Sequence, residues 1–392
     1  MNRWSSNWLR IRNNVRESNA NNFDLIRLVA ATQVAIHHSS THLQVNLHES
    51  WLFKLTALFP GVPIFFFVSG FLISKSFERN PELVDYVTNR VLRIFPALIV
   101  CFALSVSSVY ASGYFETVEV SPAQLIRWFA AQVTFLQFFN PEFMRGYGVG
   151  VLNGSLWTIP VELQFYIIVP LLYLLAKRLT RTAELSNALL IGLIAFFLAM
   201  NQYYVLARGI AGEQIWYKLL GVSFAPWVYM FLVGVLFQRN FAFFHRVLAG
   251  RLIAVSLAYV ALALGARFWF GWSFGNTLNP VTLFALCVVT FAAAYSFNTL
   301  SDRLLQRNDI SYGMYIYHMP VTNLLIHHGF SGSYLALAAA LFMSAALALL
   351  SWRLVEKPAL GLKRHPLYRH IAPAAARAEG ASAKGNKALD GR

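Results

Sequence analysis

Arginine and histidine side chains interrupt the first long apolar stretch of the sequence. This stretch, FDLIRLVAATQVAIHHSSTHL (23–43), contains Arg27, His37 and His38. Arg27 and His38 are eleven residues apart. At about 100° per residue, a helix places them on one face, about 16 Å apart along its axis. His37 lies about 100° around the helix from His38 and therefore faces elsewhere.

The shared face combines a permanent cation with a group that exchanges protons near neutral pH. Charged side chains inside a bilayer are costly, so this face must look into protein or a wet cavity. Two interpretations remain open. Arg27 pairs with Asp24 while His38 is a packing histidine, or the face is functional and His38 accepts and returns a proton.

Two further stretches place polar groups in the second and third apolar runs. FFFVSGFLIS (65–74) contains Ser69, followed by a glycine, and small residues of this kind let helices approach closely. RVLRIFPAL (90–98) places Arg90 and Arg93 one turn apart. Taken alone, such a pair is typical of a helix anchored at the cytoplasmic face.

Two later stretches carry a carboxylate and a histidine. SLWTIPVELQFYIIVPLL contains Trp157 and Glu162, the latter at the predicted outer end of a helix. A carboxylate there complements the helix dipole. SYGMYIYHMPV contains His318 shortly before Pro320. Packing at a proline kink is sufficient to explain this histidine.

Composition shows what kind of protein must position these groups. Of the 392 residues, 57% are hydrophobic and only 12% are charged, with a mean hydropathy of +0.51. Soluble domains are closer to one quarter charged. The net charge of +15 comes from residues between apolar runs, which favours orientation in a membrane over binding of nucleic acid. Cys101 and Cys287 lie inside apolar runs without disulfide or metal-binding spacing, so we expect no bound metal.

The apolar runs predict an all-α polytopic membrane protein with about ten transmembrane helices. With a cytoplasmic N-terminus, the inner loops hold 25 Lys and Arg residues and the outer loops 6. This bias predicts that both termini are cytoplasmic. The predicted spans are 23–43, 59–76, 94–112, 156–176, 187–207, 223–239, 252–270, 280–297, 312–329 and 334–354.

One apolar segment, 126–139, is too short to span and would reverse the charge bias of every later loop. We therefore predict a re-entrant or interfacial segment on the outer side. The glycine-rich stretch 145–155 would complete a cap there, beside Glu162 and above a cavity at His38.

The domain organisation follows from the same pattern. Residues 1–22 form a cytoplasmic N-terminal segment, without the features of a cleaved signal peptide. Residues 23–360 form the transmembrane domain. The Ala-, Gly- and Lys-containing residues 361–392 form a cytoplasmic tail without regular structure.

Taken in order, these stretches and a late VEKP (355–358) resemble the integral-membrane acyltransferase 3 family over about residues 20–360. The resemblance implies a ten-span transferase of the bacterial inner membrane that modifies cell-envelope glycans. Its donor would be cytoplasmic acyl-CoA, most commonly acetyl-CoA, used as a substrate, with no permanently bound cofactor. The acceptor would be a hydroxyl group of a surface polysaccharide, an O-antigen or a lipid-linked sugar. Membrane lipids would surround the protein, and no nucleic acid is expected.

The resemblance also implies roles for individual residues. Arg27, Arg90 and Arg93 would bind the phosphates of coenzyme A through bidentate hydrogen bonds at the cytoplasmic mouth. His38 would act as general base on the acceptor hydroxyl, or as a nucleophile that forms an acyl-imidazole. Glu162 would orient this histidine or bind a sugar.

The remaining candidates belong to the substrate side of the site. They are Trp157, Ser69 and His318.

Two other classes of protein are compatible with a polar helix face. A proton-coupled transporter or flippase would also use intramembrane Arg and His. Against it, Glu162 is the only carboxylate well inside a predicted span, and paired broken half-helices are not evident. A scaffold without catalysis leaves the polar face unexplained.

Overall fold

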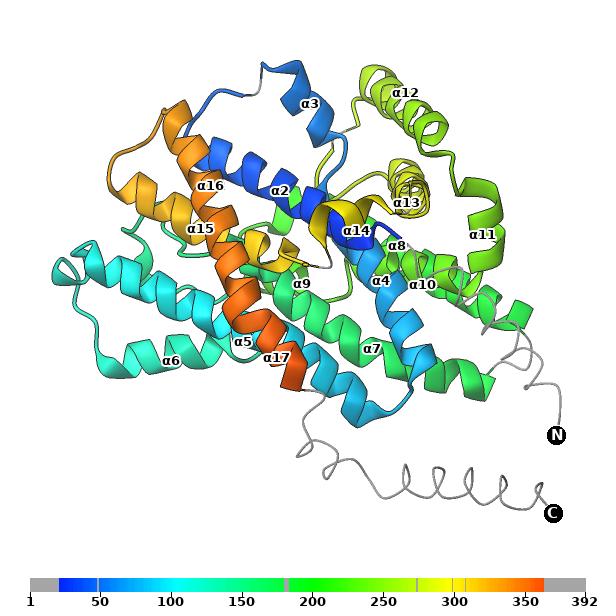
Figure 1. The fold of residues 1–392 in the computed structure, drawn as a ribbon, viewed down its shortest axis with the longest axis horizontal. Coiled ribbons are helices and arrows are strands. Elements are labelled where there is room, and N and C mark those ends of the chain that lie inside the picture. Colours follow the sequence, from blue (N-terminus) through cyan, green and yellow to red (C-terminus); the bar gives the residue numbers. More distant parts are fainter. Residues whose placement is uncertain are drawn as a thin grey trace, which may run out of the picture.

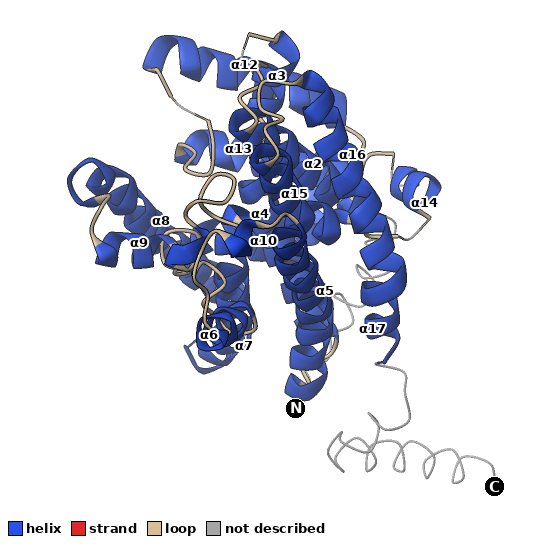
Figure 2. Cartoon of the chain, turned by 90° about the vertical axis from the view of Figure 1, so that its left-hand side faces the viewer, coloured by secondary structure: helices blue, strands red, loops and turns tan. Residues whose placement is uncertain are grey.

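The computed structural model describes residues 21–362 except 48, 180–182, 273, 298 and 307. Over these residues the chain forms helices and loops without strands (Figure 2), which confirms the all-α class. The α-helices are α2 (Phe23–His42), α3 (Trp51–Ala57), α4 (Gly61–Arg79), α5 (Leu83–Ala111), α6 (Pro122–Gln132), α7 (Thr158–Leu179), α8 (Ala183–Ala211), α9 (Ile215–Gly221), α10 (Val228–Arg239), α11 (Phe241–Leu248), α12 (Leu252–Phe270), α13 (Pro280–Ala294), α14 (Leu300–Leu305), α15 (Ser311–His327), α16 (Tyr334–Ser351) and α17 (Lys357–Gly361). Shorter helical turns are η1 (Tyr114–Glu116), η2 (Glu142–Met144), η3 (Gly154–Trp157) and the π-helical turn η4 (Trp352–Glu356).

The helices fit a polytopic membrane protein, and each predicted span contains one of them. Within the described residues, six helical stretches are long and apolar enough to cross a membrane. They are Trp51–Arg79, Leu83–Ala111, Gly154–Ala176, Ser186–Ala211, Leu252–Phe270 and Tyr334–Gly361. The count of ten spans and the side of both termini remain predictions.

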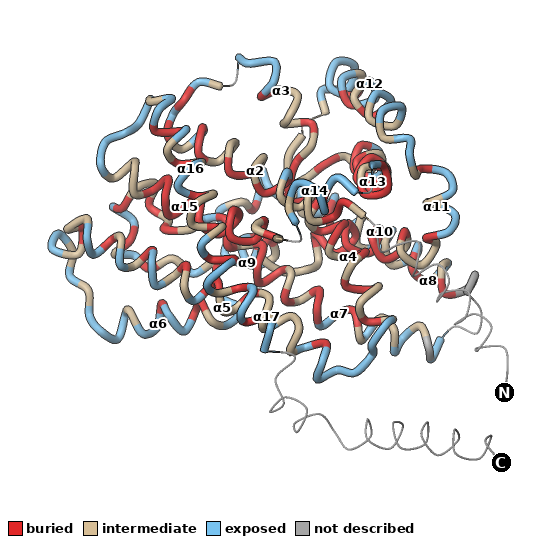
Figure 3. Tube along the Cα trace, viewed as in Figure 1, coloured by how far each residue is buried: buried red, intermediate tan, exposed pale blue. Residues whose placement is uncertain are grey.

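Large apolar side chains cover the outside of the bundle, as a lipid environment requires. On α12, Phe268 and Trp269 are more than 70% exposed. The buried residues gather in the middle of the bundle, while α6 and α11 are largely exposed (Figure 3).

Glycines allow α4 and α10 to pack backbone against backbone at the centre of the bundle. A Cβ atom on Gly70 would lie 1.9 Å from the carbonyl oxygen of Phe231. A Cβ atom on Gly234 would lie 2.1 Å from that of Phe67. The predicted close helix approach at the Ser-Gly pair of α4 is thereby confirmed.

Helices from opposite ends of the sequence form the core next to this pair. α2 packs against α15, and both contact α16 (Figure 1). The hydroxyl groups of Ser39 on α2 and Thr322 on α15 lie 2.8 Å apart at a fully buried contact. Arg27 lies at Asp309 and Ser39 at Thr322, so the two helices run parallel and their N-terminal ends share one side of the bundle.

The predicted re-entrant or interfacial segment, 126–139, belongs to the stretch between the end of α5 and the start of α7. α6 has 11 residues, about 16 Å, which is too short to cross a bilayer. Trp128 of α6 packs against Phe102, in the middle of α5, with ring centroids 5.0 Å apart. The chain then follows α15, where Asn153 donates a hydrogen bond of 2.8 Å to the carbonyl of Ile316. These contacts fit a segment that enters the bundle and turns back.

The glycine-rich stretch between α6 and α7 is fixed to the C-terminal half of α15. Asn323 accepts a hydrogen bond from the backbone N–H of Val149 and donates to the carbonyls of Val151 and Leu152. Gly148 adopts a left-handed conformation (φ 55°) directly against Asn323, where a side chain would clash. Gly146 and Gly150 also form hydrogen bonds with Tyr114 and Asn140, so the stretch is held from both sides, and its role as a cap stays a prediction.

Candidate functional site

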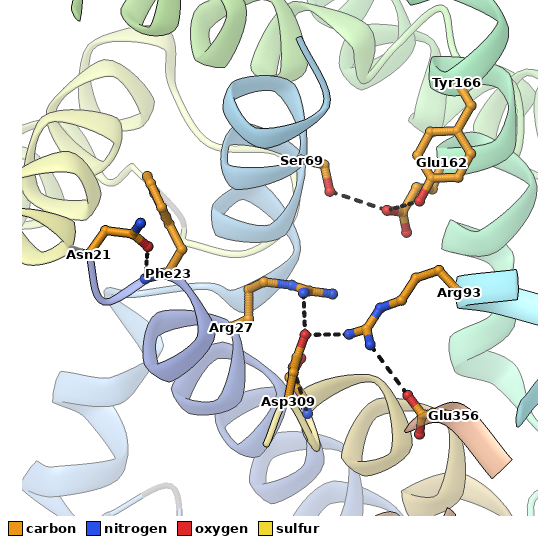
Figure 4. Close-up of polar contacts among 10 residues, drawn as sticks. Asn21, Phe23, Arg27, Ser69, Arg93, Glu162, Tyr166, Asp309 and Glu356 are labelled. Atoms are coloured by element: carbon orange, nitrogen blue, oxygen red, sulfur yellow. Dashed lines mark hydrogen bonds and ion pairs between the residues drawn. The ribbon is translucent and has the colours of Figure 1, made fainter. Parts of the chain in front are cut away.

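A buried ion network joins four parts of the chain, which are α2, α5, the residues just before α15 and the turn η4 (Figure 4). Arg27 of α2 lies 2.5 Å from Oδ2 of Asp309, measured from Nη1. Arg93 of α5 donates a hydrogen bond to the same oxygen, and its Nη1 lies 3.6 Å from Oε2 of Glu356. We call these four residues the arginine cluster.

Local structure fixes the two carboxylates of the arginine cluster. Asp309 precedes α15, and its Oδ1 accepts hydrogen bonds from the backbone N–H and the hydroxyl of Ser311. Glu356 ends the π-helical turn after α16 and accepts a hydrogen bond of 3.1 Å from Ser351. Such π-helical turns are rare and often mark functional sites.

Neighbouring residues keep the carboxyl group of Asp309 ionised. Burial alone would raise the pKa of this carboxyl group. Arg27 and Arg93 outweigh burial and, with the hydrogen bonds from Ser311, lower the pKa to about 2. Asp309 is therefore ionised at neutral pH and offsets part of the charge of the two guanidinium groups.

Arg90 differs from the other two arginines. It donates a hydrogen bond of 3.2 Å to Ser76, and its guanidinium carbon lies 5.6 and 5.5 Å from the ring centroids of Tyr86 and Tyr166. Its Nε atom is buried without a hydrogen-bond partner. Among the described residues Arg90 forms no ion pair, so of the three arginines it is the one whose charge is not compensated by a carboxylate.

Glu162 lies in the same part of the core as Arg27 and Arg93 (Figure 4), and none of its described hydrogen bonds reaches His38. Its Oε1 accepts hydrogen bonds from Ser69 (3.2 Å) and Tyr166 (2.7 Å), and its charge acts on Arg27. The expectation that Glu162 occupies the outer mouth next to His38 is therefore wrong.

The displacement of Glu162 has a structural cause. α7 does not begin at the outer surface, because it follows the segment that turns back inside the bundle. The hydroxyl of Thr158, its first residue, lies 2.9 Å from that of Tyr315, about one turn into α15. Glu162 is one turn further along and thus reaches the level of Arg27.

Two histidines form the second polar group of the core. Nδ1 of His38 lies 3.0 Å from Nε2 of His318. His318 is fully buried, whereas His38 is partly exposed. The ring of His42 lies 6.2 Å from that of His38. His318 thus contacts the candidate base, and its predicted contact with substrate stays a prediction.

His37 faces another neighbour, as the helical phase predicts. Its Nε2 lies 3.1 Å from the hydroxyl of Thr56, and its ring stacks on Phe53 with centroids 4.0 Å apart. Trp157 also lies apart from both polar groups. Its ring packs 5.1 Å from Trp227 at the start of α10, so its contacts there are aromatic.

The structure thus brings together residues that the sequence left separate. Arg27 and His38 lie on one helix, α2, and their partners Asp309 and His318 belong to the start and the middle of α15. The arginine cluster and the histidine pair therefore each contain one contact between α2 and the region of α15.

Asp309 was not singled out in the sequence because it is a lone acid between apolar runs. Glu356 was quoted only as part of VEKP. Glu356 directly follows a long apolar helix, and an acid at such a position indicates a buried carboxylate.

Comparison with known proteins adds information independent of this geometry. A family model described as an acyltransferase domain matches residues 21–353. The chain is 32% identical over 372 residues to Nodulation protein 10 of Rhizobium leguminosarum bv. viciae, covering 90% of this chain and 97% of that protein. It is 29% identical over 350 residues to an O-acetyl transferase of Shigella phage Sf6, covering 86% and 95% of the two chains.

A third relative is matched over a shorter region. The chain is 25% identical over 178 residues to the peptidoglycan O-acetyltransferase OatA of Listeria monocytogenes, covering 43% of this chain and 26% of that protein. No solved structure matches the chain.

Proposed function

The chain belongs to the acyltransferase 3 family of multi-pass membrane proteins, and from this premise we propose that it is an O-acetyltransferase of the bacterial inner membrane. It takes the acetyl group from cytoplasmic acetyl-CoA and transfers it to a hydroxyl group of a cell-envelope glycan. The names of two relatives, an O-acetyl transferase and a peptidoglycan O-acetyltransferase, support an acetyl donor and a glycan acceptor.

The arginines support a donor that carries phosphate groups. A guanidinium group matches phosphate oxygens through paired hydrogen bonds. Arg90 is the first candidate, since its charge lacks a carboxylate partner among the described residues. Arg93 lies one turn from Arg90 on α5, and Asp309 joins Arg93 to Arg27, so that the three arginines offer a site for phosphate groups.

The observation that carries the proposal is that the arginine cluster and the histidine pair both join α2 to the region of α15. Arg27 and His38 lie on one face of α2, about 16 Å apart. A coenzyme A molecule whose phosphates bind among the arginines extends its pantetheine arm along this face. The thioester then comes close to His38.

The transfer step requires one base. His38 accepts the proton of the acceptor hydroxyl as its oxygen attacks the thioester carbonyl. The new C–O bond forms, the C–S bond breaks, and the CoA thiolate leaves and takes up the proton from the imidazolium. The products are an O-acetyl ester and free CoA thiol.

The test uses the full chain in lipid nanodiscs with acetyl-CoA and a candidate glycan. We expect thiol release that depends on the glycan, together with a mass gain of one acetyl group on it. His38→Ala should abolish both while the protein remains folded by size-exclusion chromatography. Proton-coupled movement of the glycan across vesicles without ester formation would favour the transporter instead.

A further inference from the structure

His318 lies between a backbone carbonyl and the candidate base. Its Nδ1 is 2.7 Å from the carbonyl oxygen of Tyr315, and its Nε2 is 3.0 Å from Nδ1 of His38. The three groups form a line, from Tyr315 through His318 to His38, within the core of the bundle. The inference drawn from this line rests on the proposed function, in which His38 is the base.

The proton positions follow from what each atom is able to do. A carbonyl oxygen only accepts hydrogen bonds, so Nδ1 of His318 carries a hydrogen and donates it to Tyr315. A neutral imidazole has one N–H, which leaves Nε2 of His318 as an acceptor. Nδ1 of His38 must therefore donate to it, and we assign the remaining lone pair of His38 to Nε2.

Burial supports the neutral form of His318. The side chain is fully buried, and a positive charge there would lie far from water without a carboxylate among its described contacts. His38 and the more distant His42 and His37 are the titratable side chains that act on this pair. None of them provides a negative charge.

The helix around His318 is shaped to hold its ring. Pro320 has no N–H, so the carbonyl of Ile316 loses its partner within α15. Asn153 and the thiol of Cys101 donate to that carbonyl instead, at 2.8 and 3.3 Å. Hydrogen bonds from Asn153 and from Cys101 of α5 thus hold the turn that contains His318 in place, which limits rotation of the imidazole.

We propose that His318 is a positioning residue that holds His38 in the tautomer with an unprotonated Nε2. Among the described residues, Nε2 of His38 has no hydrogen-bond partner, so this atom is available to the acceptor hydroxyl. Without His318 the ring of His38 is free to place its hydrogen on Nε2, and in that tautomer the atom is not a base. In a serine hydrolase, a buried carboxylate accepts the hydrogen of Nδ1 and so fixes the tautomer of the catalytic histidine. His318 has the same role toward His38.

Substitutions separate positioning from packing. His318→Leu removes the acceptor for His38, and we expect kcat to fall by about 100-fold or more with little change in KM for either substrate. His318→Gln retains a side-chain acceptor, and we expect it to recover kcat to within about 10-fold of wild type. The matched control is Thr322→Val, which removes the hydroxyl that contacts Ser39 and donates to the backbone carbonyl of His318, while the imidazole of His318 keeps its contacts with His38 and Tyr315. We expect this variant to keep its kcat.

A spectroscopic measurement needs no substrate. In ¹⁵N-histidine-labelled protein, the His38 signals are identified by their loss in His38→Gln. In wild type, Nε2 of His38 should show the shift of an unprotonated ring nitrogen and Nδ1 that of a protonated one. In His318→Leu this pattern should weaken or reverse.

The outcomes distinguish this inference from the proposed function. A protonated Nε2 on wild-type His38, or full kcat in a folded His318→Leu variant, would overturn the positioning role alone. Lack of acetyl transfer to every glycan, with the expected tautomer present, would instead count against the proposed function.

Discussion

Arg27 and Asp309 are 282 positions apart in the chain, yet Nη1 and Oδ2 of their side chains lie 2.5 Å apart. The pair ties the first described helix to the start of α15. Arg93 of α5 shares the same carboxylate oxygen, so one acid holds three segments together.

Asp309→Asn should destabilise the protein, because it leaves two buried guanidinium groups with less compensating charge. Removal of one partner from a buried ion pair typically costs about 3–5 kcal/mol. We expect a lower midpoint of thermal unfolding in detergent, followed by fluorescence-detected size-exclusion chromatography. Glu213→Gln is the control, since this exposed acid pairs with Lys218 at the surface and its loss should leave the midpoint unchanged. Equal midpoints for both variants would contradict a structural role of Asp309.

The contribution of Asp309 to stability should depend on pH with a defined sign. The pKa of Asp309 is lowered from its ordinary value of 3.8 to about 2 in the folded chain. A lowered pKa stabilises the folded state above the unfolded-state value, and this stabilisation is lost as pH falls through the folded-state value. The stability difference between wild type and Asp309→Asn should therefore shrink as pH falls below about 4. A difference that grows on acidification would show that another group dominates.

Arg90 and Arg93 should respond differently to substitution. Arg90→Gln removes a cation that has no carboxylate partner among the described residues, so we expect a higher KM for acetyl-CoA at nearly unchanged thermal stability. Arg93→Gln leaves Asp309 and Glu356 undercompensated and should lower stability as well. Donor and acceptor saturation curves, measured beside unfolding midpoints, check both statements. Impaired acceptor use with normal donor saturation in Arg90→Gln would refute the donor role.

His37 and His38 provide an internal comparison on adjacent positions. His38→Ala should abolish acetyl transfer, whereas His37→Ala should retain most of it, because His37 contacts Thr56 and Phe53 instead of His318. Thiol release at matched protein levels is the measurement. The same loss of activity in both variants would contradict the assignment of His38 as the base.

Cysteine labelling tests the segment that contains α6. Glu119→Cys and Glu142→Cys, in a chain with Cys101 and Cys287 replaced, place thiols at exposed positions on either side of this helix. A re-entrant segment predicts that an impermeant reagent added outside the cell labels both. Labelling from opposite sides would show a true span and require a different topology.

The fold was predictable from the sequence to the extent that local patterns determine it. Apolar runs located the helices, and helical phase placed Arg27 and His38 on one face of α2 and turned His37 away. Each of these depends on residues within one segment, where periodicity is sufficient.

The sites depend on contacts that local patterns do not contain. The sequence offered Asp24 as the partner of Arg27, because it lies one turn away, but the ion pair is made by Asp309. Glu162 was misplaced because the depth at which α7 begins is set by how far the preceding segment enters the bundle. The contact of His38 with His318 likewise depends on how α2 and α15 pack.

The separation of Arg27 from Asp309 also has a consequence for biosynthesis. At about 5–20 residues per second, roughly 14–56 s pass between synthesis of the arginine and of the aspartate 282 positions later. During this time the first helix carries its arginine beside Asp24, which also acts on Arg27 in the folded chain. Arg27 meets Asp309 only when α15 arrives, and Glu356 joins the arginine cluster later still, so a late step of assembly in the membrane, and not the insertion of the first helix, completes the site.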